Sequence, residues 1–161
     1  MSELSESQGR RLLHASGIGD LATVTKLLQA GVKPDDYREP RLGWTALHKA
    51  VVNGREDVVS VLLQHGASPV LVDTRLNTAL HWAAWGDQVR VVRDILQSEQ
   101  GAECLTIRNQ GGHTPGEYAS TMGNDKLAQC MHQPGEQQRA KKESTNSSYF
   151  SDNNHPPTSN D

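Results

Sequence analysis

The fold is decided by two neighbouring stretches, TALHKAVVNGREDVVSVLLQHGA at residues 45–67 and TALHWAAWGDQVRVVRDIL at residues 78–96. The second stretch repeats the first after 33 residues. Self-similarity at a fixed period of about 20 to 50 residues is the sequence signature of a repeat protein. The chain is therefore interpreted first as copies of one unit.

Each unit is predicted to be a pair of short helices. Thr45 caps the first helix with its side-chain oxygen, and Leu47 and Ala50 share one face of that helix because they are three residues apart. Gly54 supplies the positive φ that ends this helix, and Gly66 ends the second one. The apolar stripe of the second helix consists of Val58, Val59, Leu62 and Leu63.

Two weaker copies flank the central pair. LLHASGIGDLATVTKLLQAG begins at Leu12, and HTPGEYASTMGNDKLAQCM begins at His113. One such unit cannot bury its apolar face alone, whereas stacked neighbours form a continuous elongated core. The sequence therefore predicts about four stacked units.

The period and the T-x-L-H-x-A pattern resemble the ankyrin repeat. The second unit carries the family's residues at Gly43, Thr45, Leu47, His48, Ala50, Gly54, Leu62, Leu63, Gly66 and Ala67. The resemblance covers roughly residues 8–132 and implies an all-α ankyrin solenoid of helix-turn-helix units joined by hairpin loops. The expected organisation is a flexible N-terminus at 1–7, units at 8–40, 41–73, 74–108 and 109–132, and a disordered polar tail at 133–161.

Departures from the pattern lead to further expectations. Arg10 stands at the position of Thr45, as suits an atypical first unit that caps the stack. In the third unit Asp87 replaces the expected glycine and Gly86 comes one place early, so we expect that helix–helix turn to differ locally. In the fourth unit Glu117 replaces the pattern's histidine, and we expect a degenerate C-terminal cap.

The tail at 133–161 is rich in Ser, Asn, Gln and Pro. It offers too little apolar surface to fold. Tyr149 and Phe150 are its sizeable apolar pair, so a short docking segment there is one hypothesis. The cluster of Arg139, Lys141 and Lys142 is either a solvated charge cluster or a patch for nuclear import or an acidic partner.

Composition narrows the class of protein. The formal charge of −3 and the pI near 6.1 predict no strong field toward nucleic acid. No apolar run reaches the roughly 18 residues needed to cross a bilayer, and the polar start MSELSESQGRR is not a secretory signal. We expect a monomer in the cytoplasm, the nucleus or both, with no nucleic-acid or membrane partner.

Seven histidines and two cysteines raise the question of chemistry. The resemblance implies that His48 and His81, in the T-x-L-H position, bond the backbone and lock neighbouring units. No histidine or cysteine falls in a zinc or protease motif, so no catalytic residue, metal or cofactor is predicted. Cys104, in a long loop, is expected to be accessible, and Cys130, within a helix, is expected to be buried.

The resemblance places the binding surface on the concave face, formed by the hairpin tips and the first helices. Trp82 and Trp85 share a helix face there, although Trp82 alternatively fills a gap between first helices. Exposed Trp, Tyr and Arg dominate binding hot spots. The predicted partner-binding residues are Arg41, Trp44, Lys49, Asn53, Arg75, Asn77, Trp82, Trp85 and Tyr118.

Three functional classes follow. The first is a non-catalytic interaction module, that is, an adaptor, scaffold or regulatory subunit that binds another protein. The alternative is a methyl-lysine reader, in which Trp44, Trp82 and Trp85, with Asp73 or Asp87 nearby, form a cage around the cation. An enzyme or metal protein is the third class, and the missing motifs disfavour it.

Overall fold

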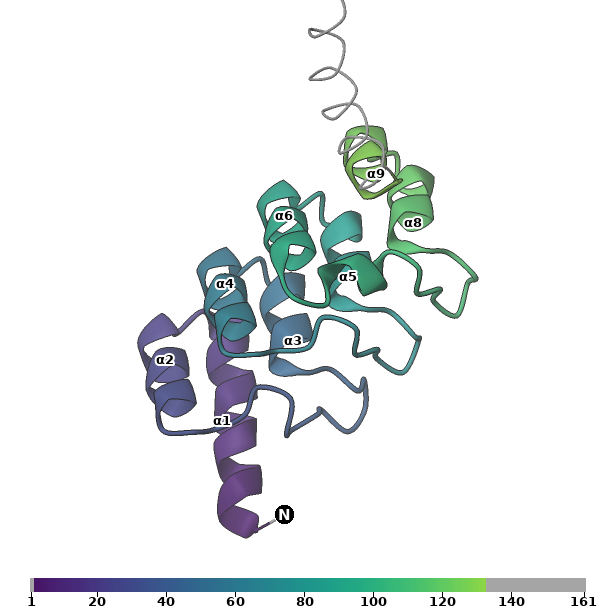
Figure 1. Ribbon diagram of the computed structural model, residues 1–161. Coiled ribbons are helices and arrows are strands. Elements are labelled where there is room, and N and C mark those ends of the chain that lie inside the picture. Colours follow the sequence, from purple (N-terminus) through teal and green to yellow (C-terminus); the bar gives the residue numbers. More distant parts are fainter. Residues whose placement is uncertain (1, 133–161) are drawn as a thin grey trace, which may run out of the picture.

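The computed structural model describes residues 2–132, which form nine α-helices and no strand (Figure 1). The first helices of the four units are α1 (Glu3–Ile18), α3 (Ala46–Val52), α5 (Ala79–Trp85) and α8 (Pro115–Thr121). The second helices are α2 (Leu21–Gln29), α4 (Glu56–Gln64), α6 (Val89–Gln97) and α9 (Asp125–His132). A short helix, α7 (Gly101–Cys104), lies between the third and fourth pairs. The predicted all-α repeat architecture is confirmed.

The helix pairs stack in chain order. The first helices form one row, with α3 packed between α1 and α5 and with α8 packed against α5. The second helices α2, α4 and α6 form a parallel row. Figure 1 shows the connecting loops reaching out from the stack on one side. This arrangement brings corresponding residues of neighbouring units side by side.

The first helices begin in the same way in three units. The side chains of Thr45, Thr78 and Thr114 each accept a hydrogen bond from the backbone N–H three residues on, which closes a capping box. A cap of this kind satisfies N–H groups that a helix start leaves without partners. It therefore fixes where each of these short helices begins.

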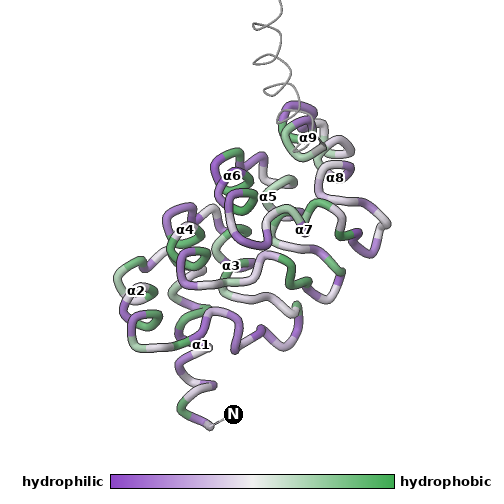
Figure 2. The backbone as a smooth tube through the Cα atoms, in the orientation of Figure 1, coloured by the Kyte–Doolittle hydropathy of each residue, from purple (hydrophilic) through white to green (hydrophobic). Residues whose placement is uncertain are grey.

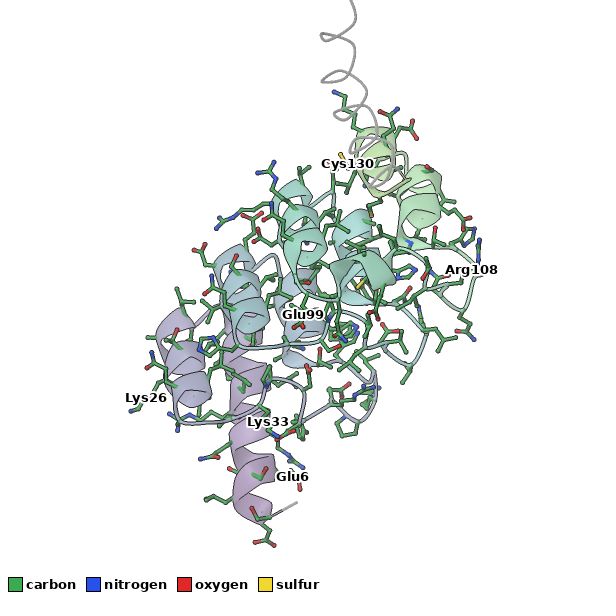
Figure 3. All side chains as sticks on the ribbon, in the orientation of Figure 1. Glu6, Lys26, Lys33, Glu99, Arg108 and Cys130 are labelled. Atoms are coloured by element: carbon green, nitrogen blue, oxygen red, sulfur yellow. The ribbon has the colours of Figure 1, made fainter. Side chains whose placement is uncertain are left out.

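The core is aliphatic, in agreement with an aromatic content of only 4% in the whole chain. Its largest fully buried apolar side chains are Leu12, Val24, Leu47, Val51, Val58, Val59, Leu62, Leu80, Val91 and Ile95. Figure 2 shows apolar and polar stretches alternating along the helix pairs, and Figure 3 shows charged side chains such as Lys26 and Glu99 projecting outward. One elongated core thus runs through the stack.

The start of the chain corrects the expectation of a flexible segment at 1–7, because α1 already includes residues 3–7. Ser2 caps the helix by accepting from the N–H of Ser5. Glu6 pairs with Arg10 at 2.6 Å, one helical turn away. Gly9 lies so close to Tyr37 that a Cβ there would lie 2.4 Å from the tyrosine Cβ. These contacts stabilise a longer first helix than the pattern predicted.

The third helix–helix turn does not differ from the others, so that expectation is wrong. Asp87 has a φ of 52°, close to the 67° of Gly54 in the preceding unit. Asp tolerates this left-handed region better than most residues. The fourth unit forms its helix pair, and the longer connection before it contains α7. The tail predicted to be disordered lies outside the described residues.

Candidate partner-binding surface

The hairpin loops that precede the first helices are joined to one another through the backbone. The N–H of Thr74 donates to the carbonyl of Leu42 at 3.0 Å, and the N–H of Gln110 donates to the carbonyl of Arg75 at 2.9 Å. Each bond links one loop to the next loop along the stack. The surface next to the first helices is therefore built on a continuous frame.

Two buried histidines add a second link between units. The Nδ1 atom of His48 accepts from the backbone N–H of Thr45 at 3.3 Å, and its Nε2 lies 3.1 Å from the carbonyl oxygen of Asn77. His81 repeats this, with Nε2 at 2.9 Å from the carbonyl oxygen of His113. Since Nδ1 accepts, Nε2 carries the proton and donates to the next unit. The structural role predicted for both rings is confirmed.

The electrostatics of these rings follow from their burial. Desolvation lowers the pKa of His48 and of His81 below the ordinary value of 6.5. The bond from each Nε2 to a carbonyl acts in the opposite direction and is the smaller effect. Both imidazoles are held neutral, and neither is placed as a free base.

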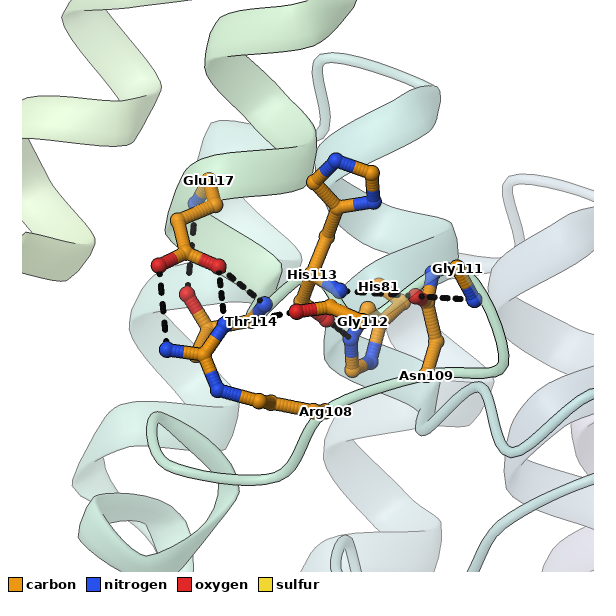
Figure 4. Close-up of polar contacts among 8 residues, drawn as sticks. All are labelled: His81, Arg108, Asn109, Gly111, Gly112, His113, Thr114 and Glu117. Atoms are coloured by element: carbon orange, nitrogen blue, oxygen red, sulfur yellow. Dashed lines mark hydrogen bonds and ion pairs between the residues drawn. The ribbon is translucent and has the colours of Figure 1, made fainter.

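The fourth unit replaces the histidine by a carboxylate with the same local function (Figure 4). Glu117 accepts from the N–H of Thr114 at 2.9 Å and pairs with Arg108 at 2.7 Å. The bond from Thr114 and that from Arg108 lower the pKa of Glu117. A carboxylate has no proton to donate to a further unit, which is consistent with the position of this unit at the end of the described stack.

Asp73 organises the surface at its centre. Its Oδ1 accepts from the backbone N–H groups of Arg75 and Asn77, both at 2.9 Å. Its Oδ2 accepts from the indole Nε1–H of Trp82 at 3.0 Å and from that of Trp44 at 3.4 Å. The residue is 5% exposed, and a buried charge of this kind needs such donors. Asp73 thereby fixes the hairpin and two tryptophans together.

The three tryptophans form a continuous row. The rings of Trp44 and Trp82 meet edge to face with their centroids 5.8 Å apart, and those of Trp82 and Trp85 do the same at 6.2 Å. Trp44 and Trp82 are half-buried, whereas Trp85 is 54% exposed. Lys49 lies over Trp44, with Nζ 5.1 Å from the ring centroid. We call Trp44, Trp82, Trp85 and Lys49 the tryptophan row.

The other predicted surface residues are spread around this row. Arg41, Asn53 and Arg75 are exposed. Asn77 is half-buried and its side-chain oxygen accepts from Asn109 at 3.0 Å, so it also links two loops. Tyr118 belongs to a separate aromatic group, because its ring centroid lies 6.2 Å from that of His81 and 6.5 Å from that of His113.

The sequence interpretation missed Leu76, which is 48% exposed at the hairpin tip with a φ of 59°. A signal was present: Leu76 corresponds to Gly43 and Gly112, which also have positive φ. Leu76 is an apolar residue at a position that favours glycine, and it supplies exposed apolar area beside Arg75. Leu42, also at a hairpin tip, is 42% exposed.

Both cysteine expectations are wrong. Cys104 is fully buried, because α7 turns its side chain inward, and burial raises the pKa of its thiol to about 12. Cys130 is exposed on α9. Within residues 2–132 no group of three His, Cys, Asp or Glu side chains is arranged to hold a metal ion. No helix in that range is long and apolar enough to span a bilayer.

Known proteins share the repeat. A family model described as ankyrin repeats (3 copies) matches residues 12–107. The mitochondrial disaggregase of Bos taurus is 33% identical over 154 residues, covering 73% of this chain and 22% of the relative. The 2-5A-dependent ribonuclease of Homo sapiens is 41% identical over 75 residues, which is 42% of this chain and 10% of the relative.

Ankyrin repeat domain-containing protein 40 of Mus musculus is 40% identical over 77 residues, covering 47% of this chain and 21% of the relative. In all three comparisons the chain spans less than a quarter of the relative's length. The similarity therefore concerns the repeats and not the activities that the relatives' names describe. Since the family model matches more than half of its length, this chain belongs to the ankyrin-repeat family.

Proposed function

We propose that this protein is a non-catalytic interaction module that binds another protein through the tryptophan row and the hairpin tips beside it. Ankyrin repeats generally mediate protein–protein interaction and are generally non-catalytic. Through such binding the protein would serve as an adaptor, a scaffold or a regulatory subunit. The cytoplasmic or nuclear location and the monomeric state expected from the sequence stay predictions.

The observation that carries the proposal is the exposure of Trp85 on a rigid support. A tryptophan that is 54% exposed and packed edge to face on Trp82 presents a large apolar area that is supported on one side. Trp82 is in turn held by Asp73. A partner that covers Trp85 meets a side chain that has little freedom left to lose, and such preorganisation favours affinity.

The charges around the row indicate the chemistry of the partner. Arg41 and Arg75 are exposed on neighbouring hairpin loops, and the row itself contains Lys49, which lies over Trp44. Cations beside an apolar anchor suit a partner segment that combines an aliphatic or aromatic side chain with acidic residues. We expect Trp85 to supply the anchor contact and the two arginines to set the salt dependence of association.

The methyl-lysine alternative gains no support from this geometry. Lys49 already lies over the face of Trp44, where a methylated ammonium would have to bind. The Asp73 carboxylate, proposed as the acid of the cage, is surrounded by four N–H donors. The first class of function is therefore preferred.

The test compares two single variants in which the side chains replaced are similarly exposed in the wild type. Trp85→Ala removes the anchor, and Ile18→Ala, at a position that is 55% exposed on α1, removes apolar area elsewhere. Proteins captured from extract by the wild type and by Ile18→Ala, but lost with Trp85→Ala, support the proposal. Circular dichroism verifies that both variants keep their helices. Equal capture by all three proteins refutes the placement of the surface.

A further inference from the structure

An apolar groove lies between α6 and α9, among the second helices of the stack. Its volume is about 270 Å³, and its apolar lining comes from Val89, Val92, Leu96 and Leu127. Val89 is 51% exposed. Arg93, Gln97 and Cys130, all exposed, complete the lining. Figure 3 shows Cys130 on α9, the helix after which the described part of the chain ends.

The equivalent junction one unit earlier is bridged by polar contacts. Arg90 on α6 pairs with Glu56 at 3.3 Å and with Asp57 at 3.1 Å on α4. The hydroxyl of Ser60 donates to Asp94 at 2.6 Å. These contacts bridge α4 and α6, and the pocket of about 300 Å³ that remains there has polar residues such as Ser60 and Asp94 in its lining.

The α6–α9 junction lacks these contacts because its residues differ. Aligned by the first residues of the helices, Val89 and Lys126 take the positions of Glu56 and Arg90. Arg93 and Cys130 take the positions of Ser60 and Asp94. Within the described residues no hydrogen bond or ion pair joins α6 to α9. The groove is thus an apolar gap at a place where the stack is otherwise bridged.

The chain itself supplies a matching segment. Residues 133–161 follow directly on α9, one wall of the groove, and contain no Leu, Ile, Val, Met or Trp. Tyr149 and Phe150 are the large apolar residues of that stretch, and Asp152 follows two residues later. Arg93 is exposed and makes no ion pair with the described residues, so a carboxylate beside a seated aromatic pair has a cation to meet.

The tether is long enough for this contact. Sixteen residues separate His132 from Tyr149, and a chain of that length spans up to about 50 Å when fully extended. A tether of this length holds its end at an effective concentration on the order of millimolar. Even a weak segment is then bound for much of the time, and the contact needs no second molecule.

We propose that the α6–α9 groove is the docking site of the chain's own Tyr149–Phe150 segment. The segment covers Val89 and Leu96, places Asp152 near Arg93 and shields the thiol of Cys130. The contact is separate from the tryptophan row, so its failure would leave the proposed partner binding untouched.

The native Cys130 thiol reports on the groove in the full chain. Cys104 is buried and its pKa is raised to about 12, so it does not compete for a disulfide reagent at pH 8. The rate of reaction with 5,5′-dithiobis(2-nitrobenzoic acid) is measured for wild type and for Tyr149→Ala/Phe150→Ala. Ser147→Ala/Ser148→Ala serves as the control, because it alters the same stretch without removing an aromatic ring.

We expect the aromatic double variant to react about threefold faster or more, the change that follows when the effective concentration is at least twice the segment's dissociation constant. Val89→Asn should also accelerate the reaction of the wild-type chain, and should add little in the aromatic double variant. Equal rates in wild type and the aromatic double variant overturn the proposal. Protection that disappears on dilution also overturns it, since a second copy would then be the occupant.

Discussion

Replacing Asp73 by Asn separates the two functions of this carboxylate. Its Oδ1 accepts from two backbone N–H groups of the hairpin, and its Oδ2 accepts from the indoles of Trp82 and Trp44. An Asn oxygen preserves the hairpin half, as the next unit demonstrates: Asn109 Oδ1 accepts from the N–H groups of Gly111 and His113 at 3.0 and 3.1 Å. The Asn amide nitrogen, however, is a donor and faces two indole donors.

The size of the effect follows from these distances. A hydrogen bond to a charged acceptor contributes about 1.5 to 3 kcal/mol. The bond from Trp82, at 3.0 Å, falls in that class, whereas the bond from Trp44, at 3.4 Å, is long and weak. Removing the buried charge offsets part of the loss. We therefore expect Asp73→Asn to lower the free energy of unfolding by about 2 kcal/mol, or the melting temperature by about 6 °C.

Denaturant unfolding followed by circular dichroism gives the stability, and near-ultraviolet dichroism reports the order of the tryptophans. Asp87→Asn is the matched control, because it removes the same charge from an exposed side chain. The positive φ at position 87 also suits Asn. This control should stay within about 0.5 kcal/mol of wild type. If Asp73→Asn is as stable as Asp87→Asn and keeps its near-ultraviolet signal, the indole contacts do not hold the row and the reasoning is refuted.

Three further predictions concern other parts of the stack. Because the folded pKa of His48 and of His81 lies below the unfolded 6.5, the contribution of the two rings to stability should be constant above about pH 7 and fall below pH 6.5 by up to about 1.4 kcal/mol per pH unit for each ring. A midpoint of urea unfolding that is unchanged from pH 7.5 to 5.5 would contradict this. Gly43→Ala and Gly54→Ala each place a residue with a Cβ at a positive φ and should each lower the free energy of unfolding by about 1 kcal/mol or more. The larger loss is expected at Gly43, where a Cβ would lie 3.2 Å from the backbone nitrogen of Thr74, whereas a Cβ at Gly54 would meet open space. Equal losses in thermal unfolding would show that the contact with Thr74 has no effect. In native protein at pH 8 one thiol per chain, that of Cys130, should react with a disulfide reagent, and Cys104 should react only after denaturation. Two fast-reacting thiols in native protein would show that α7 does not bury Cys104.

Local chemistry made the repeat units predictable from the sequence. Thr45 and Gly54 act through groups within a few residues of themselves, as a cap and as a positive-φ turn. Such contacts recur with the period, so one good copy identifies the others. The histidine lock reaches further, from His48 to Asn77, yet it too recurs at His81. Periodic contacts of this kind can be inferred from a pattern.

Features that occur once were not predictable in the same way. The inserted connection before the fourth unit folds into α7 and buries Cys104, while the last helix turns Cys130 outward. Among the units within residues 2–132, the third-to-fourth connection alone contains a helix such as α7, so the repeat pattern held no information about which way these thiols face. The extra turns of α1 depend on Glu6, Arg10 and the packing of Gly9 on Tyr37, which are likewise single contacts.

The candidate site lies between these two cases. That Trp44, Trp82 and Trp85 lie on one surface follows from their positions in the repeat. The contact of Asp73 with two indoles does not follow from the repeat, because the equivalent Asn109 accepts from the backbone of the next hairpin and contacts no tryptophan through a hydrogen bond. Asp73 uses one oxygen for the function that Asn109 serves in the next hairpin and the other for its contact with the two indoles. The repeat thus supplies the frame, and a single carboxylate, at a position where the next hairpin also uses a side-chain acceptor, holds Trp44 and the Trp82 on which the exposed Trp85 packs.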